Sequence, residues 1–274
     1  MRALSCKHTL LHRALPHGLV NSISLNVFAD PFMPDVTDQL APAAIQERTD
    51  AVRERIAQAC ERSGRDAEEI TIVAVSKTFP LHAVDAAVEA GLRHFGENRA
   101  RPLRDRVEQR PGQWAGGALC WHMIGHLQRN KAKYVARHAD RFDALDSPRL
   151  AKELNKRAGK NNRVLPCLVQ VNISGADQKY GLEPDALHDF LDGCEAYDHL
   201  RIDGLMGMAS FVDDSETVRS EFAHLRTLAA TYSGGTDNVN LRELSMGMTN
   251  DFEVAIEEGS TMVRLGSALF GPRS

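Results

Sequence analysis

Strand-like and helix-like segments alternate eight times along this chain, and that alternation restricts its fold more than any other feature. The predicted strands are Ile70–Val75, Arg93–Gly96, Ala118–Ile124, Arg141–Leu145, Val164–Val171, Ile202–Met208, Leu241–Ser245 and Met262–Leu265. A helical pattern follows each strand, and one more helix is predicted over residues 42–64. Strands that alternate with helices usually pair in parallel. Eight such units predict an α/β fold, a closed (β/α)8 TIM-type barrel, with a doubly wound open sheet as the alternative.

The helices that follow the strands complete these units. They are expected at about His82–Ala90, up to Arg110, Gln128–Arg137, Pro148–Ala158, Pro184–Glu195, Ser215–Tyr232 and Asp251–Glu258, with a short helix after the last strand. No linker rich in Gly, Ser or Pro separates the units. Residues 41–274 are therefore predicted to form one domain.

The first 29 residues differ from the rest because they contain three basic residues and no acid before Asp30. That bias is typical of organelle transit peptides. A reading frame extended upstream, with Met33 as the true start, explains it equally well. In either case we expect residues 1–40 to be a poorly ordered extension outside the barrel.

Charge and cysteine content exclude several classes of protein. The 33 Lys and Arg residues against 37 Asp and Glu residues give a net charge of −4, which argues against nucleic-acid and membrane-surface binders. No apolar run reaches the roughly 18 residues of a membrane span. The five cysteines are scattered and form no CxxC pair, so we expect reduced thiols in the cytoplasm, without disulfides or a zinc-thiolate site.

Lys77 follows the apolar strand Ile70–Val75 directly, and it is the first candidate for chemistry. A lysine beside a strand is commonly only a solvated surface residue. In a barrel, however, chemistry gathers at the carboxyl ends of the strands, where a partly desolvated lysine has a lowered pKa and a nucleophilic amine. The main use of such an amine is an imine with an aldehyde such as pyridoxal 5'-phosphate (PLP).

A phosphorylated aldehyde also needs an anion site, and the ends of the last two predicted strands offer one. "SMGM" supplies the Ser245 hydroxyl and a backbone loosened by Gly247, and "LGSALFG" places Gly266 and Ser267 at the start of a short helix. Helix starts favour anions, and these two loops are the usual phosphate site of the fold. Each pair taken alone is more often an ordinary turn, but their joint placement on neighbouring strand ends favours a phosphate site.

Arg264 lies at the end of the last strand, and two interpretations apply to it. It can form a structural ion pair, or it can donate to the ring nitrogen of the cofactor. Because arginine keeps its proton, the second arrangement would leave that nitrogen unprotonated and weaken the ring as an electron sink.

His122 and His126 are four residues apart, but they flank a strand end and lack the Glu of an HExxH zinc motif. We therefore expect no metal site, and either histidine can pack in the fold or contribute to the rim of the cofactor site. Lys179, beside Tyr180 in a long predicted loop, is a candidate contact to a partner or to a second cofactor molecule.

Several stretches of the sequence, considered together, resemble the pyridoxal phosphate homeostasis protein family. They are "VAVSKTFP", "FGENRAR", "WHMIGHLQRNK", "LVQVNISGADQKYGL" and "LSMGMTNDFEVAIEEGSTMVRLGSALFG". The family is similar to the N-terminal barrel of alanine racemase, and the resemblance spans about residues 41–271. It implies that Lys77 forms a Schiff base with PLP. It also implies cofactor contacts from Asn98, Ser245, Met246, Arg264, Gly266 and Ser267, to which the predicted phosphate loop adds Gly247. "FGENRARPLRDR" and "LMGMASF" differ from the commonest wording of the family.

Two functions follow from this resemblance, a non-catalytic carrier of PLP and an amino-acid racemase. The racemases provide a second acid/base, a tyrosine from an additional β domain, whereas this sequence ends at Ser274, nine residues after Leu265. With one general base and a weak electron sink, proton abstraction should be slow. We therefore expect no catalytic residue and a monomeric cytoplasmic protein of PLP homeostasis, with PLP and PLP-dependent apo-enzymes as partners. A third reading, a barrel that binds no ligand, predicts a colourless protein.

Overall fold

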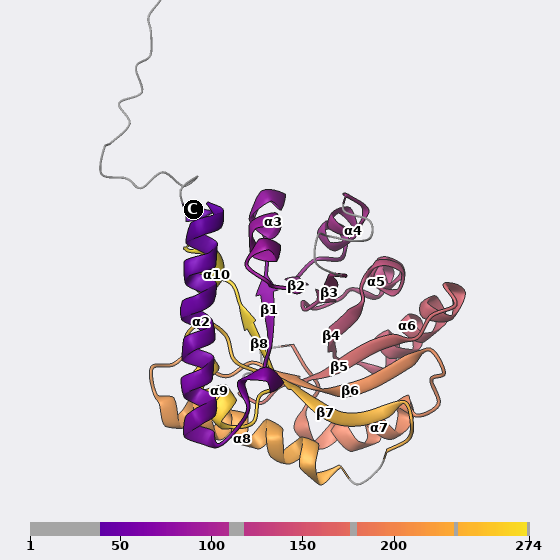
Figure 1. The fold of residues 1–274 in the computed structure, drawn as a ribbon. Coiled ribbons are helices and arrows are strands. Elements are labelled where there is room, and N and C mark those ends of the chain that lie inside the picture. The colour runs from indigo at the N-terminus through magenta and orange to yellow at the C-terminus, as the bar shows by residue number, and fades with distance from the viewer. Residues whose placement is uncertain (1–38, 110–117, 176–179, 233–234, 273–274) are drawn as a thin grey trace, which may run out of the picture. The chain divides into compact units, whose positions relative to one another are not determined.

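The computed structural model describes residues 39–109, 118–175, 180–232 and 235–272 (Figure 1). Its strands are β1 Thr71–Val75, β2 His94–Glu97, β3 Cys120–Met123, β4 Arg141–Leu145, β5 Leu165–Val171, β6 Leu200–Gly207, β7 Val239–Ser245 and β8 Met262–Leu265. Its α-helices are α2 Pro42–Ser63, α3 Leu81–Glu89, α4 Ala100–Gln109, α5 Ala132–His138, α6 Pro148–Lys160, α7 Leu187–Cys194, α8 Ser215–Thr231, α9 Phe252–Glu257 and α10 Ser267–Phe270. Short 3-10 helices lie at Ala67–Glu69, Arg129–Lys131 and Pro184–Ala186.

The strands form one closed parallel barrel in the order β1 to β8. The barrel closes because β1 pairs with β8, with Thr71 opposite Met262 and Ala74 opposite Leu265. Closure leaves no strand edge exposed to unwanted pairing. The predicted (β/α)8 barrel is confirmed, and the open-sheet alternative is wrong.

The predicted elements agree with the observed ones to within a few residues. The helix predicted over 42–64 is α2, which ends at Ser63. The helix predicted over Pro184–Glu195 is divided into a 3-10 turn and α7. Strand β6 starts at Leu200, two residues earlier than predicted, because Leu200 is buried and pairs with Leu165 of β5. The apolar runs therefore predicted where the strands lie, whereas the first and last residues of each strand depend on its pairing with neighbouring strands.

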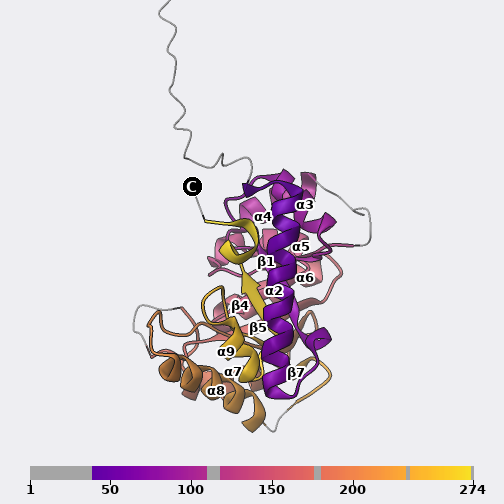
Figure 2. The ribbon, with the colours of Figure 1, turned by 60° about the vertical axis from the view of Figure 1, so that its left-hand side comes forward.

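Helix α2 precedes the first strand and packs on the outside of the barrel against α3, α9 and α10 (Figure 2). Its apolar residues recur at helical spacing, and Ile45, Val52 and Ile56 are buried. Arg48 fastens α2 to the end of the chain by donating from Nε to the Leu269 carbonyl oxygen, 2.8 Å away. The helix thus covers the seam where β1 and β8 meet.

Two further expectations from the sequence concern membrane spans and the N-terminal extension. Within the described residues, no helix is long and apolar enough to cross a membrane. The predicted extension over residues 1–40 falls almost entirely outside the described part of the chain.

Candidate functional site

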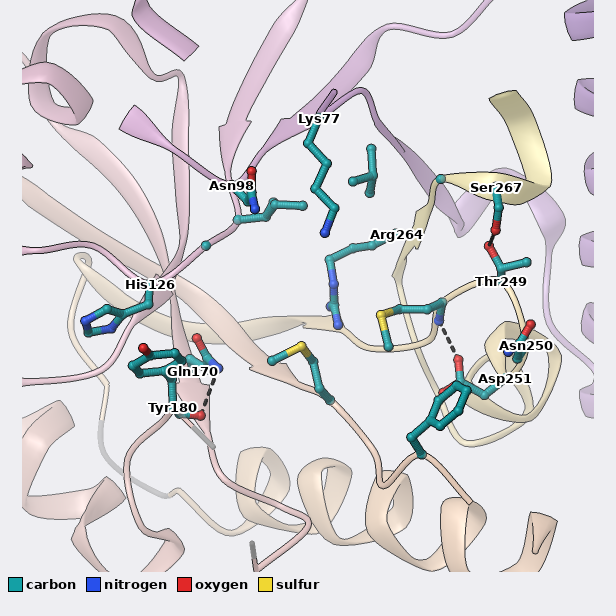
Figure 3. Close-up of a pocket in the computed structure, with 17 residues that line it drawn as sticks. Lys77, Asn98, His126, Gln170, Tyr180, Thr249, Asn250, Asp251, Arg264 and Ser267 are labelled. Carbon is teal, nitrogen blue, oxygen red and sulfur yellow. Dashed lines mark hydrogen bonds between the residues drawn. The ribbon is translucent and has the colours of Figure 1, made fainter. Parts of the chain in front are cut away.

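A cavity of about 480 Å³ opens at the carboxyl ends of the barrel strands (Figure 3). That volume lies within the range of roughly 300–1,000 Å³ that small-molecule sites occupy. Its lining comes from both the first and the last strands of the barrel. The lining residues are Val75, Lys77, Asn98, Ile124, Gly125, His126, Gln170, Tyr180, Met208, Phe211, Met248, Thr249, Asn250, Asp251, Arg264, Gly266 and Ser267.

Lys77 enters this cavity from the turn that follows β1. Figure 3 shows its side chain extended into the cavity towards Arg264, and the residue is half-buried. The next residue, Thr78, has a φ of +73°, in the left-handed region that a β-branched side chain rarely adopts. Such a conformation costs about 1–2 kcal/mol. The turn that presents the amine is therefore strained and must be held by its neighbours.

Two charged residues hold that turn from below. Arg106 on α4 donates hydrogen bonds to the carbonyl oxygens of Ser76 and Phe79, at 3.0 and 2.6 Å. Its Nε also lies 2.6 Å from Glu97 Oε1, which accepts a second hydrogen bond from the Ser76 hydroxyl at 2.8 Å. Burial raises the pKa of Glu97, and the Arg106 charge opposes that rise. These bonds fix the backbone on both sides of Lys77.

Asn98 reaches the cavity beside Lys77 because a glycine stands opposite its backbone. A Cβ placed on Gly125 would lie 2.4 Å from the Asn98 carbonyl oxygen and 2.9 Å from its Cα. Real Cβ contacts are not that short, so only glycine permits this approach between the loops after β2 and β3. The pair defines the wall of the cavity next to the lysine.

Arg264 on β8 supplies a buried positive charge to the cavity. Its Nη1 donates to the carbonyl oxygen and the hydroxyl of Ser245, both at 2.7 Å, and its Nη2 donates to the Gly207 carbonyl oxygen at 2.9 Å. Burial lowers the pKa of Arg264 to about 10, while the charges of Asp143 and Asp251 act in the opposite direction. The guanidinium therefore remains protonated at neutral pH and is held in one orientation.

The loops after β7 and β8 meet on the other side of the cavity. The Ser267 hydroxyl lies 3.3 Å from the Thr249 hydroxyl, and Gly266 precedes the first turn of α10. The Met248 amide donates to Asp251 Oδ1 at 2.5 Å, which orders the loop after β7 (Figure 3). Burial raises the pKa of Asp251, although this hydrogen bond lowers it in part. The two hydroxyls and the amides at the start of α10 form a polar surface suited to an anion.

Five of the eight predicted site residues line the cavity: Lys77, Asn98, Arg264, Gly266 and Ser267. The other three lie one layer deeper. Ser245 orients Arg264, as described above, and the Met246 amide donates to the Met262 carbonyl oxygen at 3.1 Å. Gly247 has a φ of +92°, and a Cβ there would meet Ala255 at 2.6 Å. In this structure these three residues support the cavity from beneath.

The wall opposite the anion surface consists of His126, Tyr180 and Gln170. The His126 and Tyr180 rings stack with 4.1 Å between centroids and 12° between planes. Asp146 accepts from His126 Nδ1 at 2.7 Å, and Gln170 Nε2 donates to the Tyr180 carbonyl oxygen at 2.9 Å (Figure 3). His126 thus contributes to the rim, whereas His122 is buried in the barrel against Asp143.

Sequence reasoning did not single out Gln170, Thr249, Asn250 and Asp251, which also line the cavity. A signal existed for each. Gln170 is the one amide in the apolar run of β5, and the polar residues 249–251 directly follow the "SMGM" that was assigned to the site. Lys179, the candidate for a second cofactor contact, lies outside the described residues.

Comparisons with known proteins agree with this architecture. The family model "Alanine racemase, N-terminal domain" matches residues 48–274. The chain is 40% identical over 227 residues to the pyridoxal phosphate homeostasis protein of Aquifex aeolicus, covering 83% of this chain and 97% of that protein. The protein of the same name from Escherichia coli K12 is 40% identical over 223 residues, covering 81% and 94%.

A solved structure shares both the fold and a third of the sequence. PipY of Synechococcus elongatus PCC7942, with PLP bound, superimposes with a TM-score of 0.72 at 32% identity, covering 83% of this chain and all of PipY. The family match and the 40% identity over nearly the whole length of the relatives lead to one conclusion: this chain belongs to the pyridoxal phosphate homeostasis protein family, whose barrel is that of the alanine racemase N-terminal domain.

Proposed function

We propose that this protein binds pyridoxal 5'-phosphate in the cavity, with Lys77 as its Schiff-base lysine, and acts in intracellular PLP homeostasis. The observation that carries the proposal is the convergence of Lys77, Arg264 and the Ser267 loop on one cavity. When bound, PLP supplies an aldehyde that condenses with an amine and an aromatic ring that can accept electrons. PLP is also the ligand of the PipY structure.

The residues of the cavity fit the three chemical parts of this cofactor. The Lys77 amine matches the aldehyde, since their condensation forms a C=N bond and releases water. The hydroxyls of Thr249 and Ser267 and the amides at the start of α10 suit the phosphate. Arg264 offers N–H donors to the ring nitrogen, while Ser245 and Gly207 hold its guanidinium in place.

This chain binds and retains the cofactor rather than using it for turnover. Arg264 keeps its own proton, so it would donate a hydrogen bond to the ring nitrogen without protonating it, and the ring would remain a weak electron sink. Among the described lining residues, Tyr180 is the one tyrosine, and its ring is stacked on His126. Racemisation needs a second acid/base opposite the lysine, which this arrangement does not favour.

The wider role also follows from the chemistry of the site. Free PLP is a reactive aldehyde, and a protein that holds it without turnover can buffer it and supply PLP-dependent apo-enzymes. We place this activity in the cytoplasm, because the described Cys60, Cys120, Cys167 and Cys194 are all thiols. A monomer is sufficient, since every group used above belongs to one chain.

Reduction with borohydride tests the proposal directly. The protein is loaded with PLP and reduced, and the modified peptide is located by mass spectrometry. We expect one adduct on Lys77, together with visible absorbance that is absent from Lys77→Ala. Lys131→Ala is a matched control, because Lys131 lines an adjoining cavity at the same end of the barrel and should not alter the adduct. Full labelling of the Lys77→Ala protein would refute the proposed site.

A racemase assay tests the absence of turnover. With PLP-loaded protein and either enantiomer of alanine, we expect a turnover number below about 1 s⁻¹, the low end for ordinary enzymes. A faster reaction that is lost in Tyr180→Phe would assign Tyr180 as the second acid/base and overturn the non-catalytic role.

A further inference from the structure

A second polar cluster lies at the other end of the barrel, where β2 and β3 begin. His94 and Cys120 are the first residues of these strands and pair in register, and His122 follows two residues after Cys120. Side chains two apart on a strand share a face, so Cys120 and His122 point to the same side. We call His94, Cys120 and His122 the floor cluster. None of them belongs to the PLP cavity described above.

The potential ligand atoms of the floor cluster converge. His94 Nδ1 lies 3.0 Å from His122 Nε2, and Cys120 Sγ lies 3.4 Å from the same Nε2 atom. All three atoms are within 4.8 Å of one another. His122 is fully buried, whereas His94 and Cys120 are half-buried.

A buried carboxylate orients the central histidine. Asp143 Oδ2 lies 2.7 Å from His122 Nδ1, and both side chains are fully buried. This pairing holds a proton on Nδ1 and directs Nε2 towards His94 and Cys120. A carboxylate behind a histidine is the usual outer partner of a metal-binding imidazole. Among the described residues, the other oxygen, Asp143 Oδ1, has no hydrogen-bond partner.

Hydrogen bonds among the three residues cannot satisfy all the polar atoms of the floor cluster well. When His122 is neutral with its proton on Nδ1, its Nε2 offers one lone pair, and two potential donors, His94 Nδ1 and the Cys120 thiol, compete for it. A thiol is itself only a weak donor. A cation placed between the three atoms can bond all of them at once.

The charges around the floor cluster also accommodate a cation. Arg141 is a neighbouring positive charge, with its Nε 3.8 Å from Asp143 Oδ1. Its guanidinium is paired with Glu243 and lies 3.6 Å from Asp203. Asp203 also pairs with Arg201 at 2.6 Å, so three carboxylates offset the arginines near the floor cluster.

We propose that His94 Nδ1, Cys120 Sγ and His122 Nε2 bind a zinc-class divalent ion, with water in the fourth position. Two imidazoles and a thiolate are ligands that Zn²⁺ favours, with bonds of about 2.0–2.1 Å to nitrogen and about 2.3 Å to sulfur. A tetrahedral ion with such bonds separates its ligands by about 3.3–3.6 Å. The observed 3.0 and 3.4 Å would open by a few tenths of an ångström, and His94 Nδ1 and Cys120 Sγ, which lie within 4.8 Å of each other, would settle at about 3.6 Å. The Cys120 thiol releases its proton to solvent on binding.

The ion would fasten the starts of β2 and β3 together, and metal titration tests it. The full chain is treated with a chelator, freed of it, and titrated with Zn²⁺ against a chromophoric competitor. We expect one equivalent to bind and, with Co²⁺ instead, a sulfur-to-cobalt charge-transfer band. Zn²⁺ should also raise the melting temperature, because it binds the folded state.

Two variants at half-buried positions identify the ligands. Cys120→Ser should abolish the cobalt–sulfur band, and Cys120→Ser and His94→Asn should each weaken Zn²⁺ binding at least about 10-fold, as loss of even an outer partner does. Cys6→Ser and the exposed His82→Asn are controls that should bind as the parent does. Absence of saturable Zn²⁺ binding in the folded parent chain, or unchanged binding in both ligand variants, would leave only a hydrogen-bonded cluster and overturn the proposal.

Discussion

Arg106 and Glu97 form an ion pair beneath the turn that carries Lys77, with 2.6 Å between Arg106 Nε and Glu97 Oε1. The side chains are only 13% and 2% exposed. Neither residue lines the cavity, yet Arg106 also bonds the two carbonyl groups that flank the turn. The position of the lysine therefore depends on a residue of α4 that makes no contact with the cofactor cavity.

Removing Arg106 should damage both the fold and the site. Arg106→Ala leaves Glu97 as a buried charge without its partner, which typically costs about 3–5 kcal/mol. We expect that loss in the free energy of unfolding measured with urea, together with faster release of PLP. Arg104→Ala, on the same helix, removes an exposed ion pair and should change stability by less than about 1 kcal/mol. Equal losses in the two variants would contradict the role of Arg106.

A substitution at Thr78 should stabilise the strained turn, whereas Arg106→Ala should destabilise it. Asparagine tolerates the left-handed conformation much better than a β-branched residue, so Thr78→Asn should relieve strain at φ +73°. We expect the free energy of unfolding to rise by up to about 1 kcal/mol, with PLP still bound to Lys77. Urea denaturation measures the change. A clear destabilisation would mean that the threonine side chain itself supports the turn.

Gly125 should not tolerate even one methyl group. In Gly125→Ala the new Cβ would collide with the Asn98 backbone, and such overpacking typically costs about 1–3 kcal/mol. We expect lower stability and a higher dissociation constant for PLP, measured by equilibrium dialysis. Gly193→Ala is the matched control, because nothing lies within 4 Å of its Cβ and helix α7 should gain about 0.5–1 kcal/mol. A neutral Gly125→Ala variant would exclude this close approach.

Asp251 should give the protein a measurable pH dependence of stability. Its pKa is raised above 3.8 in the folded state, mainly by burial. As pH rises through the window above 3.8, the unfolded chain loses this proton first, so the stability of the parent falls. Asp251→Asn removes that fall and keeps an oxygen for the Met248 amide. Urea unfolding of both proteins between about pH 4 and pH 7, the range in which carboxylates finish titrating, measures the difference.

Asp214 provides a control of opposite sign when the same pH series is extended below about pH 4. It caps α8, and a hydrogen bond from Thr217 lowers its pKa below 3.8. Its stabilising contribution is present above 3.8 and is lost as pH falls towards the folded value. Asp214→Asn should therefore remove a slope that runs opposite to that of Asp251. Slopes of the same sign would show that the pH dependence has another origin.

The sequence was sufficient for the barrel because each apolar run was long enough to be a buried strand and each was followed by a helical pattern. The place of Lys77 in the cavity lining could be predicted because Lys77 follows such a run, and the carboxyl ends of barrel strands all face the same end of the barrel. Ser245 and Met246 lie at the end of β7, which was also predicted to face the site. Their hydrogen bonds with Arg264 and Met262, however, place them below the cavity lining. One-dimensional spacing cannot distinguish these layers.

Contacts between distant segments explain what the sequence did not reveal. The clash that excludes a side chain at Gly125 arises from Asn98, 27 positions earlier, and only the paired strands bring the two together. The floor cluster has no recognisable spacing for the same reason. His94 precedes Cys120 by 26 positions, and only the register of β2 and β3 places the two residues side by side.

The pairing of β1 with β8 has a consequence for how the binding site comes into existence. Lys77 and Arg264 stand 187 positions apart, and they meet only because the first strand of the barrel is also the neighbour of the last. During synthesis, the amine would emerge from the ribosome long before the guanidinium that faces it. A nascent chain thus has no complete cofactor pocket until β8 has been synthesised and paired with β1, so capture of the cofactor can only follow that step.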